Sequence, residues 1–177
     1  KMMTSRESLI STFEWDSVDI EDTVLFFSNV TPSYTISETV TNATKYYLSH
    51  LAFASKPFGY WSGSLNFRFQ VVASAFHTGR LRITFEPFGE AYSSDNYNTT
   101  YSSIIDLNGV SDVTFTVPWA QPTPYLSLNK TYQNESGPIN NFNPNYDNGK
   151  IYITVLNELV SPDTLQGVSV NVYVSGG

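Results

Sequence analysis

The sequence predicts an all-β protein built as an antiparallel β-sandwich, and three observations predict it. Several short runs alternate apolar and polar residues with a period of two, which places alternate side chains on opposite faces of a strand. Aromatic and β-branched residues are abundant in these runs. Helical spacing occurs in one short segment, so helices do not separate the strands as they would in a parallel βαβ architecture.

The clearest strands lie within residues 60–87, YWSGSLNFRFQVVASAFHTGRLRITFEP, and the rest of the chain is expected to be organised around them. Apolar and polar residues alternate over 64–72 and again over 80–86, with a short polar turn between the two runs. Each run therefore predicts a half-buried strand with one dry face. The residues expected to face the core are Leu65, Phe67, Phe69, Val71, Leu81, Ile83 and Phe85.

The segments before this pair give weaker signals. Residues 1–16 are predicted to be an arm that enters the domain, because their apolar residues follow no clear period. A first strand is expected over 18–27, and residues 33–44, rich in Ser and Thr, are expected to form a loop or a weak strand. The best helix candidate is 43–55, where apolar residues recur at helical spacing and Asn42 is placed to cap the first turn.

The second half of the chain predicts four more strands, each an alternating run bounded by turn residues. They are residues 102–107, 112–117, 150–155 and 168–174. Two polar segments, 88–101 and 120–148, have no hydrophobic period, and loops this long in a compact domain are usually functional or disordered. No internal repeat or linker divides the chain, so residues 1–177 are predicted to form a single domain.

Composition excludes several classes of function. The chain has 9 basic and 16 acidic residues, a net charge of -7, and its basic residues are scattered, which argues against a groove for nucleic acid. It has no cysteine, so disulfides and thiolate chemistry are excluded. No stretch is apolar for long enough to span a membrane.

Five N-x-S/T sequons permit two interpretations. They are Asn29, Asn42, Asn98, Asn129 and Asn134. We favour chance occurrence, because Asn, Ser and Thr are common throughout the chain. The alternative is a glycosylated secreted domain, although small secreted domains usually carry disulfides.

The sequence offers no catalytic set. It lacks a nucleophile elbow, a glycine-rich phosphate loop and a cluster of metal ligands, so we predict no enzymatic activity, no cofactor and no metal. His50 is expected to pack on the apolar face of the predicted helix. His77 lies in the turn FHTGR, where local hydrogen bonds are the expected role and a pH-sensitive group at an interface is the alternative.

Several motifs follow one another along nearly the whole chain: the W-x-G at 61–63, FHTGRL at 76–81, IIDLNG at 104–109, VTFTVPW at 113–119, IYITVLNELVSP at 151–162 and the valines of 168–174, with SRESLISTFEW at 5–15 as the segment leading in. Their order and spacing resemble the coat proteins of picornavirus-like viruses, and most closely those of dicistroviruses and their marine algal relatives. The motif residues that we single out are Trp61, Gly63, Phe76, His77, Gly79, Arg80, Leu81, Pro87, Asp106 and Pro118.

This resemblance implies an eight-stranded antiparallel jelly roll, with sheets BIDG and CHEF and one or two short helices. The implied strands are B near 18–28, C within 33–41, D at 64–72, E at 80–86, F at 102–107, G at 112–118, H at 150–156 and I at 167–174. Residues 60–87 would then cross from one sheet to the other, so that their two dry faces meet.

The resemblance also implies a function: a structural coat subunit of a non-enveloped positive-strand RNA virus. It would assemble with related capsid subunits into a pseudo T=3 icosahedral shell that encloses RNA, with no RNA site assignable on this segment. Segments 88–101 and 120–148 would be exposed or inter-subunit loops, with a host receptor as a further partner. The expected location is the virion, assembled in the host cytoplasm.

Two alternatives come from other classes of protein. A secreted or surface β-sandwich that binds carbohydrate is suggested by the sequons and by aromatic residues such as Trp61 and Trp119, although packing explains aromatic residues more often. A hydrolase on a β-scaffold is suggested only by the presence of histidine and serine.

Overall fold

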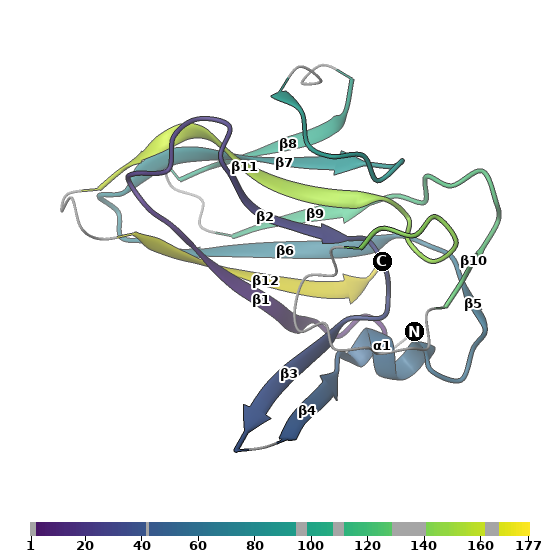
Figure 1. The fold of residues 1–177 in the computed structure, drawn as a ribbon. Helices are drawn as coiled ribbons and strands as arrows, with labels where there is room; N and C mark the ends of the chain where they lie inside the picture. Colours follow the sequence, from purple (N-terminus) through teal and green to yellow (C-terminus); the bar gives the residue numbers. More distant parts are fainter. Residues whose placement is uncertain (1–2, 42, 95–98, 108–111, 129–140, 162–166) are drawn as a thin grey trace.

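Two four-stranded antiparallel sheets pack face to face in the protein, with one short helix and two small strand pairs attached (Figure 1). The computed structural model describes residues 3–41, 43–94, 99–107, 112–128, 141–161 and 167–177. The first described residues lie beside the carboxyl-terminal strand β12, where the Gly176 amide donates to the Thr4 carbonyl at 2.7 Å.

The strand orders are those of a jelly roll. The first sheet runs β1 (Ser8–Trp15), β12 (Val168–Gly176), β6 (Leu65–Val72) and β9 (Asp112–Val117), which is the order BIDG. The second runs β2 (Val24–Asn29), β11 (Lys150–Val160), β7 (Thr78–Glu86) and β8 (Tyr101–Asp106), which is CHEF. The small pairs are β3 (Thr35–Val40) with β4 (Ala43–Leu48) and β5 (Tyr60–Trp61) with β10 (Leu126–Ser127), and α1 spans His50–Ser55. The predicted fold class is confirmed.

The strands β6 and β7 behave as their alternation predicts. Their seven apolar residues expected to face the core are each at most 3% exposed. The two strands belong to different sheets, so the turn between them carries the chain across the sandwich. The dry faces of β6 and β7 therefore meet in one core, together with the valines of β12 and the isoleucines of β11.

The positions predicted for the first two strands are wrong. Residues 8–15, expected within an arm, form β1 and pair with β12, so they occupy the B position. Strand C is β2, at 24–29, which pairs with β11. The pairing of β1 shifts register between Leu9 and Ser11. Such a bulge interrupts the period of two, which is why the sequence of this strand shows no clear alternation.

The predicted helix over 43–55 is also wrong in its first half. Residues 43–48 form β4, and the helix begins only at His50. The side chain of Ser49 caps it by accepting a hydrogen bond from the Ala52 amide at 3.1 Å; Asn42, the expected cap, lies outside the described residues. Pairing of 43–48 with β3 outweighs the helical spacing, so 33–41, expected to hold strand C, lies in a separate hairpin.

The core position of Phe67 yields a direct test of this packing. Its ring is fully buried and meets the edge of Tyr34, with ring centroids 6.2 Å apart. We expect Phe67→Ala to lower the free energy of unfolding by about 3–5 kcal/mol, because it removes apolar contacts and leaves a cavity. Urea unfolding measures the loss. Phe76→Ala, at a phenylalanine that is 77% exposed, should change it by less than about 0.5 kcal/mol.

Candidate assembly surface

The connections between strands lie at two opposite ends of the sandwich. The register pairs Val72 with Ser169 and Trp15 with Val168, so the connections after β1 and β6 are at one end, which we call the turn end. The opposite end carries the long segments after β7 and β9, together with α1, β5 and β10 (Figure 1). We call it the loop end.

Six of the ten singled-out residues lie at or beside the turn end: Phe76, His77, Gly79, Arg80, Leu81 and Asp106. Phe76 is exposed, whereas His77 is 8% exposed and fastens two turns. The His77 Nδ1 atom accepts a hydrogen bond from the Ser74 amide at 3.2 Å, and the Nε2 atom lies 3.3 Å from the Ser161 hydroxyl. The bond to Ser74 is local, as expected for this turn residue, whereas the contact with Ser161 joins a segment 84 residues further along the chain.

Gly79 and Arg80 follow at the start of β7. A Cβ atom at Gly79 would come within 2.6 Å of the Trp15 ring, so a glycine lets strand β7 approach the fully buried tryptophan. Arg80 pairs with Asp106 across β7 and β8 at 3.0 Å on the outer face of the sheet. Both side chains of this pair are about half exposed, so the ion pair contributes little stability. Leu81, the next residue, is fully buried in the core.

The remaining singled-out residues lie at the loop end. Trp61 packs edge-on against Trp119, with centroids 5.2 Å apart, and donates a hydrogen bond to the Tyr146 carbonyl at 3.0 Å. Gly63 has a φ of 126°, a conformation that favours glycine. Pro87 and Pro118 each accept a hydrogen bond through the carbonyl oxygen, from Gln121 at 3.1 Å and Asn148 at 2.9 Å respectively. The structure thus divides the motif between the two ends.

Three buried polar residues at the loop end were not singled out from the sequence. The Asn29 amide donates to the Asn141 carbonyl at 2.7 Å and to the Asp147 carboxylate at 3.0 Å. Asn148 accepts from the Ala120 amide at 3.0 Å as well as donating to Pro118. Asn29 thus ties the end of segment 120–148 to strand β2, and Asn148 ties the start of the segment to its end. In a chain so rich in asparagine, no sequence signal distinguished them.

The same hydrogen bonds decide whether one of the sequons can be glycosylated. The side chain of Asn29 has no exposed surface and both of its amide hydrogens point at protein acceptors. Asn29 therefore cannot carry a glycan in the folded chain. Asn42, Asn98, Asn129 and Asn134 lie outside the described residues.

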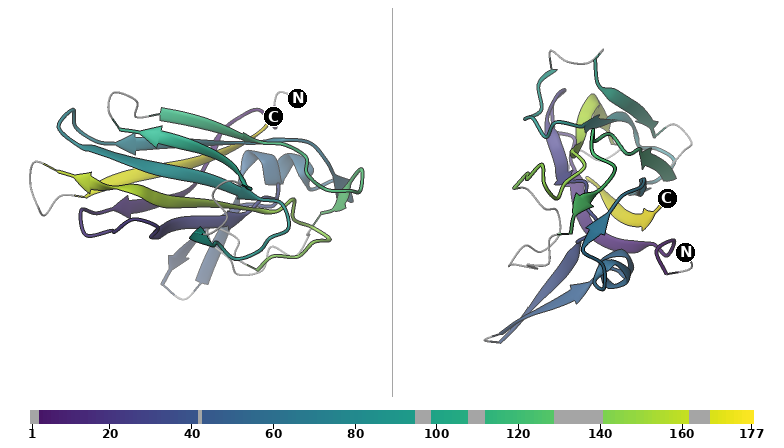
Figure 2. Two further views of the ribbon diagram at one scale, coloured as in Figure 1. Left: turned by 90° about the horizontal axis from the view of Figure 1, so that it is seen from above. Right: turned by 90° about the vertical axis from the view of Figure 1, so that its right-hand side faces the viewer.

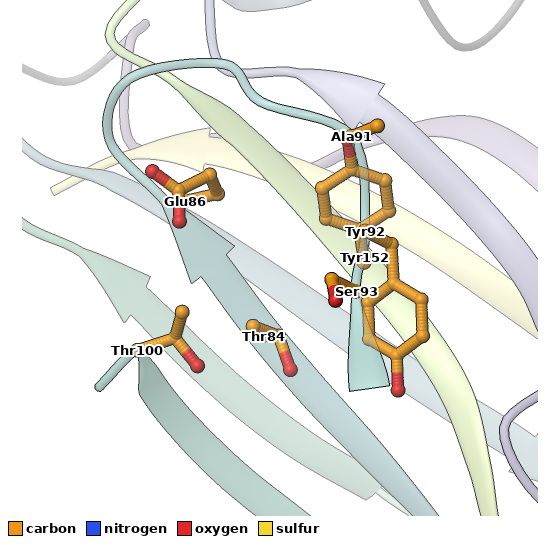
Figure 3. A pocket seen from close by; sticks show the side chains of 7 residues that line it. All are labelled: Thr84, Glu86, Ala91, Tyr92, Ser93, Thr100 and Tyr152. Carbon is orange, nitrogen blue, oxygen red and sulfur yellow. The ribbon is translucent and has the colours of Figure 1, made fainter. Parts of the chain in front are cut away.

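A second set of contacts holds the segment after β7 against the outer face of its own sheet. The rings of Tyr92 and Tyr152 lie beside each other with centroids 5.8 Å apart (Figure 3). Tyr92 donates to the Asp22 carboxylate at 3.2 Å, and Tyr152 donates to the Glu90 carbonyl at 2.6 Å. Burial raises the pKa of both tyrosine hydroxyls. These contacts hold residues 90–92 against the sheet, even though their sequence is polar and aperiodic.

Exposed aromatic residues gather at the loop end. Tyr60 and Tyr125 are 62% and 56% exposed and contact each other with centroids 5.0 Å apart. They border an open groove of about 500 Å³ whose walls also include Pro122, Pro144 and Tyr146. A neighbouring cavity of about 230 Å³ lies between α1 and the carboxyl-terminal glycines. Such surfaces are typical of sites where proteins contact one another.

The described residues offer little for chemistry. No three carboxylate or imidazole groups among them are placed to hold a metal ion. His50 lies at the start of α1, exposed, with its Nδ1 atom 2.8 Å from the Ser8 hydroxyl, and so contacts the first strand instead of lying on an apolar helix face. None of the described helices is long and apolar enough to span a membrane.

A sandwich of two four-stranded sheets in the orders BIDG and CHEF defines a jelly-roll protein whose distinctive features lie in its connecting segments and exposed surfaces. The chain belongs to the picornavirus capsid protein family, whose model matches residues 49–143. Both the match and the observed fold agree with the resemblance of the motifs.

Individual relatives extend this similarity over the whole chain. The structural polyprotein of cricket paralysis virus is 29% identical over 93% of this chain, which spans 19% of that polyprotein. A solved chain from a marine algae virus of the order Picornavirales is 30% identical with a TM-score of 0.89, and one from black queen cell virus is 25% identical with a TM-score of 0.83. The alignments cover 99% of this chain and 70% of each of those.

These similarities bear on the competing classes of function. The matched family and the solved neighbours support a structural, non-enzymatic protein. They give no support to the carbohydrate-binding alternative. The chain spans only about a fifth of the cricket paralysis virus polyprotein that it matches.

The contact of Gly79 with Trp15 predicts an unusually sensitive glycine. We expect Gly79→Ala to lower the free energy of unfolding by about 2–3 kcal/mol, because the added methyl overlaps a ring that close packing prevents from moving. Gly59→Ala is the matched control, since a Cβ atom there would meet nothing within 4 Å. Equal stability of the two variants in urea unfolding would contradict the assigned role of Gly79.

The buried hydroxyl of Tyr34 predicts a dependence of stability on alkaline pH. Burial raises the pKa of this phenol above its usual value of about 10, and the hydroxyl donates to the Asn29 carbonyl. Because the folded-state pKa is raised, the stabilising contribution is complete below about pH 10 and is lost as the pH rises further. Tyr34→Phe should lower the free energy of unfolding by about 1–2 kcal/mol at neutral pH. The free energy of unfolding of this variant should then fall less steeply above pH 10 than that of the wild type. Parallel slopes would contradict this role.

Proposed function

We propose that the protein is a structural capsid subunit of a non-enveloped positive-strand RNA virus. In this proposal it assembles with related jelly-roll subunits into a pseudo T=3 icosahedral shell that encloses the genome. One observation carries the proposal: a complete BIDG–CHEF jelly roll in a chain of the picornavirus capsid protein family. Shells of this kind close by repeated symmetric contacts between subunits.

The way in which the loops are held against the sandwich supports this role. The sandwich is rigidly packed, and the segments at its loop end are held in place by buried hydrogen bonds of Asn29, Asp147 and Asn148. Loops fixed in this way present a defined surface to a neighbour. We therefore propose segments 88–101 and 120–148 as the exposed or inter-subunit loops, of which 95–98 and 129–140 lie outside the described residues.

The remaining parts of the proposal follow from the family and rest on it. The location is the virion, with assembly in the host cytoplasm. A host receptor is a further partner, and residues 1–177 act as one domain. The chain has a net charge of -7, so we assign no RNA contact to this segment.

Co-expression of this chain, as part of its full structural protein, with the other structural proteins of the same virus tests the central proposal. We expect closed particles about 300 Å across in negative-stain micrographs, because closed symmetric assembly is the property that defines a coat subunit. A chain that remains monomeric in the presence of its partners would overturn the proposal.

A deletion tests the role of the longer loop. Asn141, Asn143 and Tyr146 accept or donate bonds that anchor the segment, so the deletion is confined to residues 129–140. We expect the midpoint of urea unfolding to change little, whereas particle yield or attachment to host cells falls. Wild-type assembly and infectivity after this deletion would show that the loop has no such role.

A further inference from the structure

The hairpin of β3 and β4 stands apart from the sandwich. It projects away from both large sheets in every view (Figures 1 and 2). Its base is fixed by the Ser49 amide, which donates to the Tyr34 carbonyl at 3.1 Å, and among the other described elements it contacts α1, the next in sequence, most. Every described residue from Glu38 to Tyr47 is exposed.

One face of this hairpin is apolar and yet open to solvent. The register pairs Ile36 with Tyr47 and Val40 with Ala43, and residues paired across two strands share a face. Ile36, Val40 and Tyr47 are 37%, 40% and 49% exposed. The opposite face is more polar: it pairs Thr39 with Thr44 and Ser37 with Tyr46, so one half-exposed ring lies there among hydroxyl groups. A lone two-stranded hairpin is only marginally stable in water. An exposed apolar face on such a hairpin is typical of a surface that binds a partner.

The charges on this face cancel. Glu38 pairs with Lys45 across the strands, and Tyr47 donates to the Glu38 carboxylate at 3.1 Å. Residues 35–48 contain these two charged side chains and no others, so the net charge of -7 belongs entirely to the rest of the chain. Acidic bodies repel one another, whereas a neutral apolar hairpin can approach an acidic neighbour without that cost.

The tip of the hairpin contains an unfavourable backbone conformation. Thr41 has a φ of 53°, a left-handed conformation that is a genuine outlier for a β-branched residue. Two-residue turns of this kind favour asparagine or glycine at such positions. Strain of this sort persists where surrounding structure holds the residue in place, and the sandwich of the same chain provides no such surroundings.

We propose that the face formed by Ile36, Val40 and Tyr47 docks onto a neighbouring jelly-roll subunit of the same shell. This inference rests on the proposed function, because it takes the occupant to be another capsid subunit. That occupant fits the observations: the face is apolar and neutral, the chain and its relatives belong to a capsid family, and the hairpin reaches beyond the outline of its own sandwich.

Hydrogen exchange of backbone amides tests the docking directly. The isolated subunit and the assembled particle are compared over residues 36–40 and 43–47. We expect exchange of these amides to slow by about 100-fold or more in the particle, because docking removes the local opening that an unsupported hairpin undergoes. The amides of β6 and β12, buried in both states, provide the internal reference.

A pair of matched double variants tests the face itself. Ile36→Asn with Val40→Asn removes the apolar face, whereas Thr39→Asn with Thr44→Asn places the same number of asparagines on the opposite face. We expect about a tenfold or greater loss of particles from the first variant and little change from the second, since buried apolar anchors carry most interface affinity. Thermal unfolding of each isolated subunit shows whether the sandwich remains intact.

The outcomes separate this inference from the function on which it rests. If the wild-type proteins form no particles, the proposed function itself fails. If particles form while the hairpin amides exchange as fast as in the free subunit, the docking inference is overturned and the capsid role stands. Normal assembly of Ile36→Asn with Val40→Asn would overturn it as well, including the case in which that variant loses only attachment to cells.

Discussion

The contact between the inner faces of β6 and β7 is the interaction on which the rest of the structure depends. These strands follow each other in the chain but lie in different sheets, so Phe67 and Phe69 of one sheet and Leu81 and Ile83 of the other enclose the same core. Close packing here fixes the separation of the two sheets. Gly79 belongs to this constraint, because its missing side chain lets the crossing strand pass over Trp15.

Buried polar side chains fix the loops, as the apolar core fixes the two sheets. Asn29, Asp147 and Asn148 are buried at the loop end: the Asn29 amide donates to the Asp147 carboxylate and to the Asn141 carbonyl, and Asn148 bonds to the backbone of Pro118 and Ala120. A buried polar group that loses its partner is costly, so such a network specifies one arrangement of the loops. At the other end, His77 joins two turns by the same principle. The long connections are therefore extensions of the scaffold with a defined shape.

This organisation suits a protein whose function lies in its surfaces. The sandwich supplies stability, the loops held by buried hydrogen bonds supply shape, and the hairpin of β3 and β4 supplies an apolar face that the described residues leave exposed. Each of these parts draws on a different region of the sequence. A shell subunit needs all three, because each copy must fold by itself and then meet several neighbours at fixed angles.

The sequence by itself determined an antiparallel β-sandwich and the six strands from β6 to β12 that belong to the large sheets. The jelly-roll order and the crossing of residues 60–87 between the sheets were implied by the resemblance of its motifs to a known family. Alternation with a period of two indicates which face of a strand is buried, and this holds wherever the strand pairing is regular. Only the tertiary structure decided where the chain enters the fold. The bulge in β1 interrupts its alternation, and residues 43–48 pair as a strand in spite of helical spacing. The roles of Asn29 and Asp147 were also decided there, since a buried polar residue is recognised by distant partners that no local pattern encodes.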